Sequence, residues 1–363
     1  MKALFANVNG PQTYGNSRSF WAVAIVVLGI ALAYPLLVDS YTVGNVTFFA
    51  LWVFMALGLS LIWGYGGMLS FGQTAFFGFA GYSYGVIAIN LGKYYAFPFV
   101  ALICALILAA LLALLIGYFM IYGRITGVFV GIVTLSLTLT LATFLNQTAG
   151  PEWRIGRARL NGYNGMTRIP PLSMPWFDGS TVYFEGITLY YLVLALLVIT
   201  YLGLRMLVNS PFGNVLVAIR ENPDRTELLG YDIRRYQLIA FVVGSTLAGL
   251  SGALYTAWGQ FIVPASMALP AAAMPIIWVA VGGRKDITAT LIGTFLVLWL
   301  FQSLIVISQQ YALIFTGALL LVTILFTPGG YIVWLVENRE RVLGWLRLRM
   351  SRTAPAASGT PGE

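Results

Sequence analysis

The chain contains no histidine and a single cysteine among its 363 residues. Histidine is the most frequent metal ligand and the most frequent general base near neutral pH, so its absence removes the usual basis of a metal centre or a hydrolytic triad. Cys104 lies within an apolar run, and alone it can form neither an intrachain disulfide nor a metal site. We interpret it as a small buried or lipid-facing residue. A membrane enzyme is therefore the least favoured class of function.

Charged side chains are also scarce, and this scarcity decides the class of protein. Only 9% of the residues are charged and 59% are hydrophobic, and the mean hydropathy is +0.85. A soluble domain carries about 25% charged residues, so this chain cannot cover a water-facing surface and must have lipid as its outer solvent. Two long uncharged runs lie between Arg235 and Arg284 and between Asp286 and Glu337. Each run is long enough for two membrane-spanning helices, which need about 20 residues apiece.

The apolar runs predict an all-α, polytopic integral membrane protein with about ten transmembrane helices (8–10). Glycine and proline interrupt the third and eighth runs, which makes these two the weakest. The first run is long enough to span a bilayer, so we interpret it as a signal-anchor helix that is retained. The predicted spans are Phe20–Val38, Val46–Trp63, Leu69–Leu91, Pro98–Tyr122, Val128–Asn146, Leu189–Leu207, Gln237–Trp258, Met267–Val281, Thr288–Ser308 and Ala312–Phe326.

The basic residues orient these spans. If the N-terminus is cytoplasmic and the spans alternate, 15 of the 20 basic residues face the cytoplasm and 5 face the outside, which is the positive-inside bias. Both termini are then cytoplasmic. The net charge of +8 belongs to loops beside the lipid bilayer, and it does not indicate a nucleic-acid-binding face. The outside set is Lys93, Arg154, Arg157, Arg159 and Arg168, and the cytoplasmic set is Lys2, Arg18, Arg124, Arg205, Arg220, Arg225, Arg234, Arg235, Arg284, Lys285 and the five arginines from Arg339 to Arg352.

This orientation divides the chain into three parts. Residues 1–19 form a cytoplasmic N-terminal segment, residues 20–336 form the transmembrane domain, and residues 337–363 form a basic, partly disordered cytoplasmic tail. A periplasmic loop covers residues 148–187, and long ordered loops are commonly functional. The sequence leaves open whether this loop forms part of a lid over a pore or only packs against the ends of the spans.

The cytoplasmic loop 208–236 is unusually ordered for a connection between two spans. Ser210 precedes Pro211 and Asn222 precedes Pro223, and each pair is typical of a helix N-cap followed by proline at the first helical position. Gly230 fits the left-handed residue that closes a helix. Helices this short are marginal in water, so either the membrane surface or a groove in a cytoplasmic ATPase must hold them.

A glycine-dense segment joins the second and third predicted spans. Glycine lets helices approach closely, and it also breaks helices so that backbone groups face a polar solute; the sequence allows both interpretations. The spans carry no Asp, Glu, Lys, Arg or His away from their ends, whereas proton-driven carriers need such groups. A stand-alone channel or secondary carrier is thereby disfavoured but stays an alternative. The candidate residues of a translocation path are Gly66, Gly67, Ser70, Gly72, Gln73 and Thr74.

Several motifs resemble those of the LivM-type permeases, the membrane subunits of bacterial ABC importers for branched-chain amino acids. They occur in the order of the family and extend over most of the chain, roughly from Val43 to Gly330. The position of Gln73 is often histidine in that family. The motifs are the segment Gly64–Gly78, Val133-Thr134-Leu135, Asn161-Gly162-Tyr163-Asn164-Gly165, Ala218-Ile219-Arg220-Glu221-Asn222, Leu229-Gly230-Tyr231, Ala240-Phe241, Ala248–Leu254 and Gly282-Gly283 ahead of Gly293.

The resemblance implies a permease subunit in the bacterial inner membrane that forms half of a translocation path for branched-chain amino acids. It implies as partners two cytoplasmic ATP-binding subunits, a homologous second permease and a periplasmic solute-binding protein, and it implies no cofactor. No phosphate-binding Gly-x-x-x-x-Gly-Lys-Ser/Thr loop is present, so ATP must be hydrolysed by another chain. Arg284-Lys285-Asp286 departs from the family pattern, and urea, short amides or another small polar solute remain alternative cargoes. The implied ATPase-coupling residues are Ala218, Arg220, Glu221, Asn222, Pro223, Arg225 and Gly230.

Overall fold

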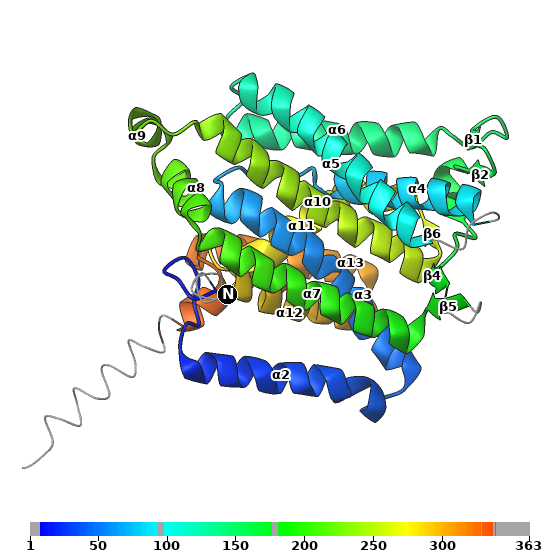
Figure 1. Cartoon of the computed structure of the whole chain (residues 1–363), viewed down its shortest axis with the longest axis horizontal. Coiled ribbons are helices and arrows are strands. Elements are labelled where there is room, and N and C mark those ends of the chain that lie inside the picture. Colours follow the sequence, from blue (N-terminus) through cyan, green and yellow to red (C-terminus); the bar gives the residue numbers. More distant parts are fainter. Residues whose placement is uncertain (1–7, 93–97, 176–180, 328, 337, 339–363) are drawn as a thin grey trace, which may run out of the picture.

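The computed structural model describes residues 8–92, 98–175, 181–327, 329–336 and 338, and the chain folds into long helices that run along a common axis (Figure 1). The helices are α2 (Arg18–Leu37), α3 (Ser40–Leu59), α4 (Gln73–Leu91), α5 (Pro98–Tyr122), α6 (Val128–Asn146), α7 (Gly186–Val208), α8 (Pro211–Glu221), α9 (Pro223–Leu228), α10 (Ile233–Gly259), α11 (Leu269–Gly282), α12 (Ile287–Ile305) and α13 (Gln309–Phe326).

The predicted polytopic architecture is confirmed. Eight of the described helices are long and apolar enough to cross a membrane, and α11 and α13 are shorter apolar helices at the positions of the eighth and tenth predicted spans. The third predicted span begins later than expected, because the helix α4 starts at Gln73 and not at Leu69. Lys2, Lys93 and nearly all of the predicted tail fall outside the described residues.

The two ends of the bundle differ in construction. The short helices α8 and α9, the N-terminal segment from Val8 to Ser17 and the end of α13 lie at one end, on the left in Figure 1. The strands in the loop between α6 and α7 lie at the other end. The described part of the chain therefore places its two termini at the same end as the loop 208–236, which agrees with the predicted alternation of spans.

The centre of the bundle is formed by α3, α4 and α10. Small residues make this close packing possible, since a side chain at Gly252 of α10 would collide with the carbonyl oxygen of Phe77 in α4. A side chain at Gly58 of α3 would in the same way collide with the backbone of Gly244. Ser251 adds a hydrogen bond from its hydroxyl to the carbonyl oxygen of Leu51 at 2.8 Å. Glycine in these spans thus serves close helix packing.

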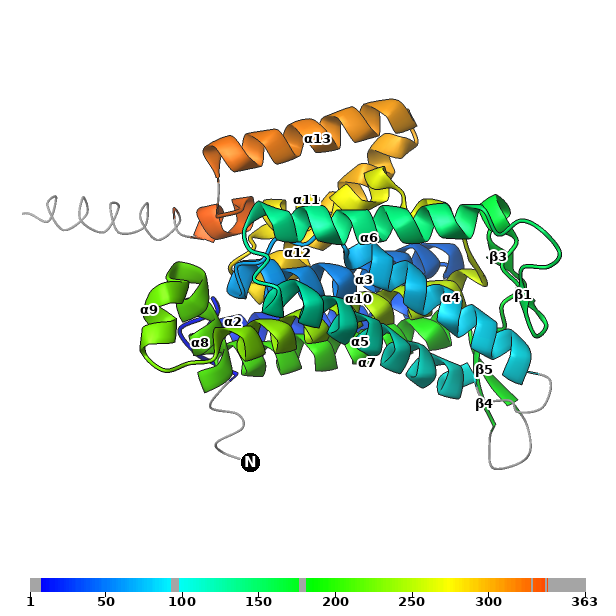
Figure 2. The ribbon, with the colours of Figure 1, turned by 90° about the horizontal axis from the view of Figure 1, so that it is seen from above.

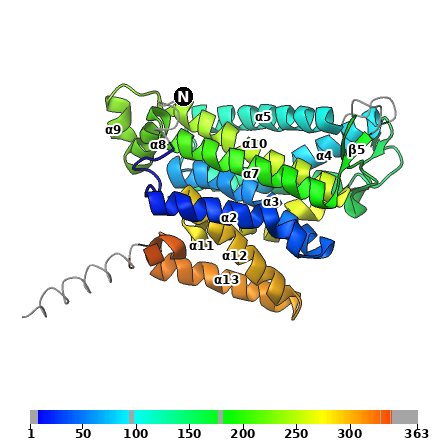
Figure 3. The same cartoon turned by 60° about the horizontal axis from the view of Figure 1, so that its bottom comes forward.

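The helix α2 lies at the edge of the bundle in Figure 1, and α13 lies at its edge in Figures 2 and 3. Few side chains of α2 are covered by the rest of the chain, and its exposed residues are almost all apolar. An apolar cavity of about 490 Å³ separates α2 from α3, α7 and α12. Both helices present the surfaces expected for contact with lipid.

Short antiparallel strands organise the loops at the end of the bundle opposite to α8 and α9. The tyrosine hydroxyl of Tyr84 in α4 donates to the carbonyl oxygen of Pro170 at 2.9 Å, and the Asn90 amide donates to the carbonyl oxygen of Ile155 at 2.8 Å. The long loop therefore packs against the end of α4. The strands are β1 (Arg154–Ile155), β2 (Ala158–Arg159), β3 (Met166–Thr167), β4 (Leu172–Pro175), β5 (Thr181–Phe184) and β6 (Phe261–Ile262), paired β1–β2, β3–β6 and β4–β5.

Candidate functional site

The loop between α7 and α10 folds into two short helices, as its sequence predicts. Asn222 caps α9, because its side-chain oxygen accepts a hydrogen bond from the backbone N–H of Arg225 at 2.9 Å. Gly230 has a φ of +90° and ends the second helix. Ser210 stands at the N-cap position of α8 as predicted, but its side chain makes no capping hydrogen bond. Its hydroxyl donates instead to the carbonyl oxygen of Leu207 at 2.6 Å. Pro211 at the first position is enough to start that helix.

The bundle itself holds α8 in place. Its buried residues Val215, Leu216 and Ile219 recur at helical spacing and face the rest of the protein, and Phe212 stacks on Tyr236 of α10 with 5.3 Å between ring centroids. The helix α9, in contrast, projects beyond the bundle (Figures 1 and 2). Together they form a projecting element anchored by one of its two helices.

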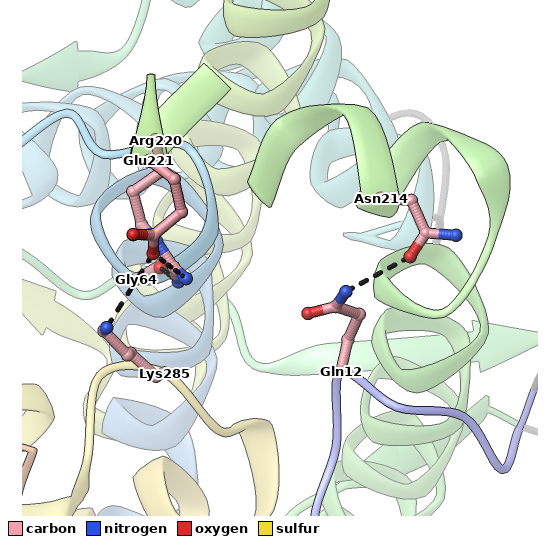
Figure 4. A network of polar contacts seen from close by, with 6 residues as sticks. All are labelled: Gln12, Gly64, Asn214, Arg220, Glu221 and Lys285. Carbon is pink, nitrogen blue, oxygen red and sulfur yellow. Dashed lines mark hydrogen bonds and ion pairs between the residues drawn. The ribbon is translucent and has the colours of Figure 1, made fainter. Parts of the chain in front are cut away.

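Arg220, at the end of α8, connects this element to the glycine-dense segment (Figure 4). Its guanidinium donates to the carbonyl oxygen of Gly64 at 2.5 Å. Gly67 has a φ of +72° and lies against the same arginine. A Cβ atom added at Gly67 would lie 3.2–3.4 Å from the Cα, Cβ and Cγ atoms of Arg220. Two regions that the sequence analysis singled out separately, the loop 208–236 and the segment from Gly66, therefore meet at one residue.

Glu221 extends this contact to the loop between α11 and α12. Its carboxylate accepts hydrogen bonds from Arg220 at 2.7 and 3.0 Å and lies 3.9 Å from the ammonium nitrogen of Lys285. The hydrogen bond from Arg220, with the charges of Arg220 and Lys285, lowers the pKa of this exposed carboxyl group. The carboxylate thus stays ionised at neutral pH and joins three segments at the end of the bundle.

The unusual Arg284-Lys285-Asp286 triplet is structural in this chain. The Arg284 guanidinium lies over the ring of Trp63, 5.1 Å from its centroid, and burial together with the nearby charge of Arg220 lowers its pKa. Asp286 caps α12 by accepting from the N–H of Ala289 at 2.7 Å. Burial raises the pKa of Asp286, although the hydrogen bonds that its carboxylate accepts from the backbone N–H groups of Ala289 and Tyr14 oppose the shift. The triplet therefore connects the start of α12 to the helical turn Ser60–Tyr65, which contains Trp63.

The N-terminal segment Val8–Ser17 completes this end of the bundle, and the sequence analysis did not find its partners. The buried guanidinium of Arg205 donates to the carbonyl oxygens of Val8 at 3.1 Å and Tyr14 at 3.2 Å. Gln12 donates through its side chain to Asn214 of α8 at 3.2 Å (Figure 4). An arginine at the end of a span is the only sequence signal for this contact, and it does not reveal which segment the arginine binds.

The glycine-dense segment is a break between two spans. Residues Ser60–Tyr65 form one turn of π-helix, and an irregular stretch follows before α4 begins at Gln73. Phe71 in this stretch donates to the hydroxyl of Thr134 at 3.0 Å and accepts from the hydroxyl of Thr138 at 3.2 Å. Both threonines lie near the middle of α6, so α4 begins part-way through the bundle.

The six predicted path residues are therefore divided between two places. Gly66 and Gly67 lie beside Arg220 at the end of the bundle, where they line a cavity of about 840 Å³ together with α8, α9 and the connection between α5 and α6. The other four gather at the start of α4, where the hydroxyl of Ser70 accepts from the N–H of Gly72 at 3.2 Å. Within the described residues, the side-chain polar atoms of Gln73 and the hydroxyl of Thr74 are buried without a hydrogen-bond partner. The remaining two of these four, Ser70 and Gly72, are also buried.

Two exposed leucines at the tip of α9 are a feature that the sequence analysis passed over. Leu228 is 88% exposed and Leu229 is 71% exposed, although they belong to the polar end of the molecule rather than to a lipid-facing helix. Adjacent exposed apolar side chains are typical of a surface that contacts a protein partner or the membrane. The sequence analysis named Leu229 only as part of a motif and did not single out Leu228.

The site holds no group of acidic residues, cysteine or histidine that could bind a metal ion within the described part of the chain. Its chemistry is that of ion pairs, backbone carbonyls and polar side chains at a helix break. Such an arrangement can transmit a movement and receive a polar solute, and it offers no nucleophile paired with a general base.

Comparison with known proteins agrees with this arrangement. The family described as "Branched-chain amino acid transport system / permease component" matches residues 41–324. The chain is 26% identical over 334 residues to the high-affinity branched-chain amino acid transport system permease protein LivM of Escherichia coli, covering 86% of this chain and 74% of that protein.

Two further relatives extend the comparison. LivM of Salmonella typhimurium is 25% identical over 84% of this chain and 73% of its own length. A probable LivH permease of the archaeon Methanocaldococcus jannaschii is 32% identical over 33% of this chain and 37% of its own length. No solved structure gives a significant match to the chain. The similarity thus reaches both types of permease and both bacteria and archaea.

Proposed function

The chain belongs to the family of permease components of branched-chain amino acid ABC transport systems, and we propose that its projecting element α8–α9 is where ATP hydrolysis in a partner is coupled to movement of the pore. Two cytoplasmic ATP-binding subunits, a homologous second permease and a periplasmic solute-binding protein complete the proposed transporter in a bacterial inner membrane. The relatives are named as permeases of such systems, which supports this assembly.

The observation that carries the proposal is the contact of Arg220 with Gly64 and Gly67. A displacement of α8 moves the guanidinium of Arg220, which holds the carbonyl group next to the helix break. Glu221 and Lys285 join the same contact to α12 through the preceding loop. The proposed coupling residues Ala218, Arg220 and Glu221 lie in α8, and Asn222, Pro223, Arg225 and Gly230 form and close α9. The break itself, from Gly66 to Thr74, is the proposed path segment.

The docking surface of this proposal is the tip of α9. Exposed apolar side chains surrounded by charged ones are typical of the centre of a protein interface. Leu228 and Leu229 provide the apolar part, and Asp224, Arg225 and Glu227 lie on the same short helix. The element is proposed to insert into a groove of the ATP-binding subunit, and the arginine at the end of α8 then transmits the resulting force to the break.

The first test separates docking from transmission. The permease is purified with its ATP-binding subunits as the native chain, as Leu228→Asp with Leu229→Asp, and as Arg220→Ala. We expect the leucine pair to lose the ATP-binding subunits, with affinity lowered about tenfold or more. Arg220→Ala is expected to keep these subunits and to lose most ATP-driven uptake in proteoliposomes.

Tyr163→Asp is the matched control, because Tyr163 is 77% exposed in the loop at the opposite end of the bundle. It is expected to retain the ATP-binding subunits. Equal recovery of the subunits with the leucine variant and the native chain would show that α9 is not the docking element. Native transport without any ATP-binding subunit would instead support a stand-alone carrier.

A further inference from the structure

The helix α4 begins inside the bundle with backbone N–H groups that have no partner. Ala75 and Phe76 donate to the carbonyl oxygen of Gly72 at 3.0 and 3.3 Å, but the described structure contains no acceptor for the N–H groups of Gln73 and Thr74. Gly72 stands at the cap position and offers no side chain. A helix start of this kind carries partial positive charge and attracts anions, and the effect is strongest away from water.

The side chains of the first two residues of α4 provide a second and independent observation. Gln73 is 1% exposed and Thr74 is fully buried. Both polar atoms of the Gln73 amide and the Thr74 hydroxyl lack a hydrogen-bond partner in the described structure. Buried polar groups are nearly always satisfied, and exceptions require an explanation. The Cα–Cβ bonds of a helix tilt toward its N-terminus, and this tilt directs the side chain of Gln73 toward the start of α4, where the two unpaired N–H groups lie.

We propose that the start of α4 is a binding site for the carboxylate of the transported amino acid, with Gln73 and Thr74 as its side-chain donors. This inference rests on the proposed function and adds to it the part of the solute that the pore recognises. The two N–H groups, the Gln73 amide and the Thr74 hydroxyl supply donors, and a carboxylate supplies two oxygens with about four acceptor positions. Hydrogen bonds to a charged group are also stronger than those to a neutral one.

The composition of the site distinguishes a carboxylate from other polar groups. The side-chain oxygen of Gln73 is an acceptor that a carboxylate does not satisfy, but the backbone N–H groups, the Gln73 amide N–H groups and the Thr74 hydroxyl outnumber it. A neutral amide or urea offers these donors a single carbonyl oxygen, whereas an ammonium group would face partial positive charge. No lysine or arginine lies in the segment Met68–Leu91, so this segment itself offers an anion only dipoles. A site made of dipoles binds an anion loosely enough to release it, which a transport path requires.

The site is closed in this structure, and its position explains how it would open. Gln73 is only six residues beyond Gly67, which lies against Arg220. The stretch between them is irregular and is held by hydrogen bonds between Phe71 and the threonines of α6. A shift of Arg220 therefore acts on the chain that leads directly into the start of α4. The carboxylate site would then be closed in one conformational state of the pore, as in this structure, and accessible to the solute in the other.

The first experiment uses the complete transporter in proteoliposomes with saturating, leucine-loaded binding protein. We expect Gln73→Leu to reduce leucine uptake about tenfold or more. Gln73→His keeps an N–H donor and is expected to retain uptake within about threefold. Gln302→Leu is the matched control, since Gln302 is an exposed residue of α12 and the same substitution there should change nothing.

A second measurement needs neither transport nor the variant. Hydrogen exchange of residues 70–76 is followed in the native complex with 4-methylpentanoate, which is leucine without its amino group, and with 3-methylbutylamine, which lacks the carboxylate. We expect the acid to slow exchange at Gln73 and Thr74 and the amine to leave it unchanged. Equal slowing by both compounds, or by neither, would overturn the site.

The two experiments separate this inference from the function on which it rests. Native uptake of leucine that Gln73→Leu leaves unchanged would overturn the carboxylate site and keep the proposed function. An absence of ATP-driven leucine uptake by the native complex would overturn the proposed function, while protection by 4-methylpentanoate would still support an anion site. Protection by every small molecule, including urea, would identify the buried polar groups as a general hydration site.

Discussion

The helices α2 and α4 stand in opposite order when they are compared by apolar character and by burial inside the protein. The helix α2 is among the most apolar of the eight candidate spans, yet only 6% of its central window is buried inside the protein. The helix α4 is the least apolar of them, and 61% of its window is buried. Lipid solvates apolar side chains, so hydrophobicity marks the outside. Small and polar residues mark the inside, where helices must approach closely and a path is proposed.

The largest expected effect comes from filling this packed interior. Gly252→Leu places a side chain against the backbone of Phe77 in α4, and neither helix can move away because both lie at the centre. We expect a loss of about 3 kcal/mol or more in the free energy of unfolding, at or above the usual range for overpacking. Gly29→Leu in α2 is the matched variant, since that position meets open space. Thermal unfolding of both purified variants tests the contrast, which equal losses would refute.

A smaller effect is expected from two arginines at the same end of the molecule. Arg205→Ala removes a buried guanidinium whose partners include the carbonyl oxygens of Val8 and Tyr14. We expect it to cost at least about 2 kcal/mol and to release the N-terminal segment to proteases. Arg235 is 75% exposed and pairs only with the half-exposed Asp232, so Arg235→Ala should cost about 0–1 kcal/mol. Limited proteolysis with N-terminal sequencing distinguishes the two variants.

The smallest effect separates the two helix starts in the projecting element. Asn222→Ala removes a cap on the N–H of Arg225, and we expect about 1 kcal/mol of local destabilisation. Hydrogen exchange in α9 should then be about fivefold faster. The side chain of Ser210 caps nothing, so Ser210→Ala should leave exchange in α8 within about twofold of the native rate. The assignment of caps would be contradicted if Ser210→Ala accelerated exchange in α8 more than Asn222→Ala accelerated exchange in α9.

Features that follow from one stretch of chain could be predicted from the sequence. The spans are defined by their own length and apolar character, and the two helices of the loop by Pro211, Asn222, Pro223 and Gly230. The prediction of a side-chain cap at Ser210 was wrong because its hydroxyl has a competing acceptor, the carbonyl oxygen of Leu207. Serine hydroxyls bond equally well to a preceding carbonyl group, and local sequence does not decide between the two.

Features that depend on partners far along the chain could not be predicted. Gly67 and Arg220 were each singled out, but only the fold brings them into contact. Arg205 was assigned to the correct end of the bundle by the distribution of charge, whereas its acceptors in the segment Val8–Ser17 lie about 190 residues earlier. The unsatisfied atoms of Gln73 likewise became visible only once the neighbouring helices were in place.

The separation between Arg205 and the segment it binds also sets an order of events during synthesis. Residues 8–17 leave the ribosome first, and their guanidinium partner is added 191 residues after Tyr14. At about 5–20 residues per second, this delay is about 10–40 s. During that interval the segment lacks its partner while the five spans α2 to α6 are synthesised. The arrival of α7 then closes the contact, so this end of the molecule is completed by a step that follows membrane insertion of its first half.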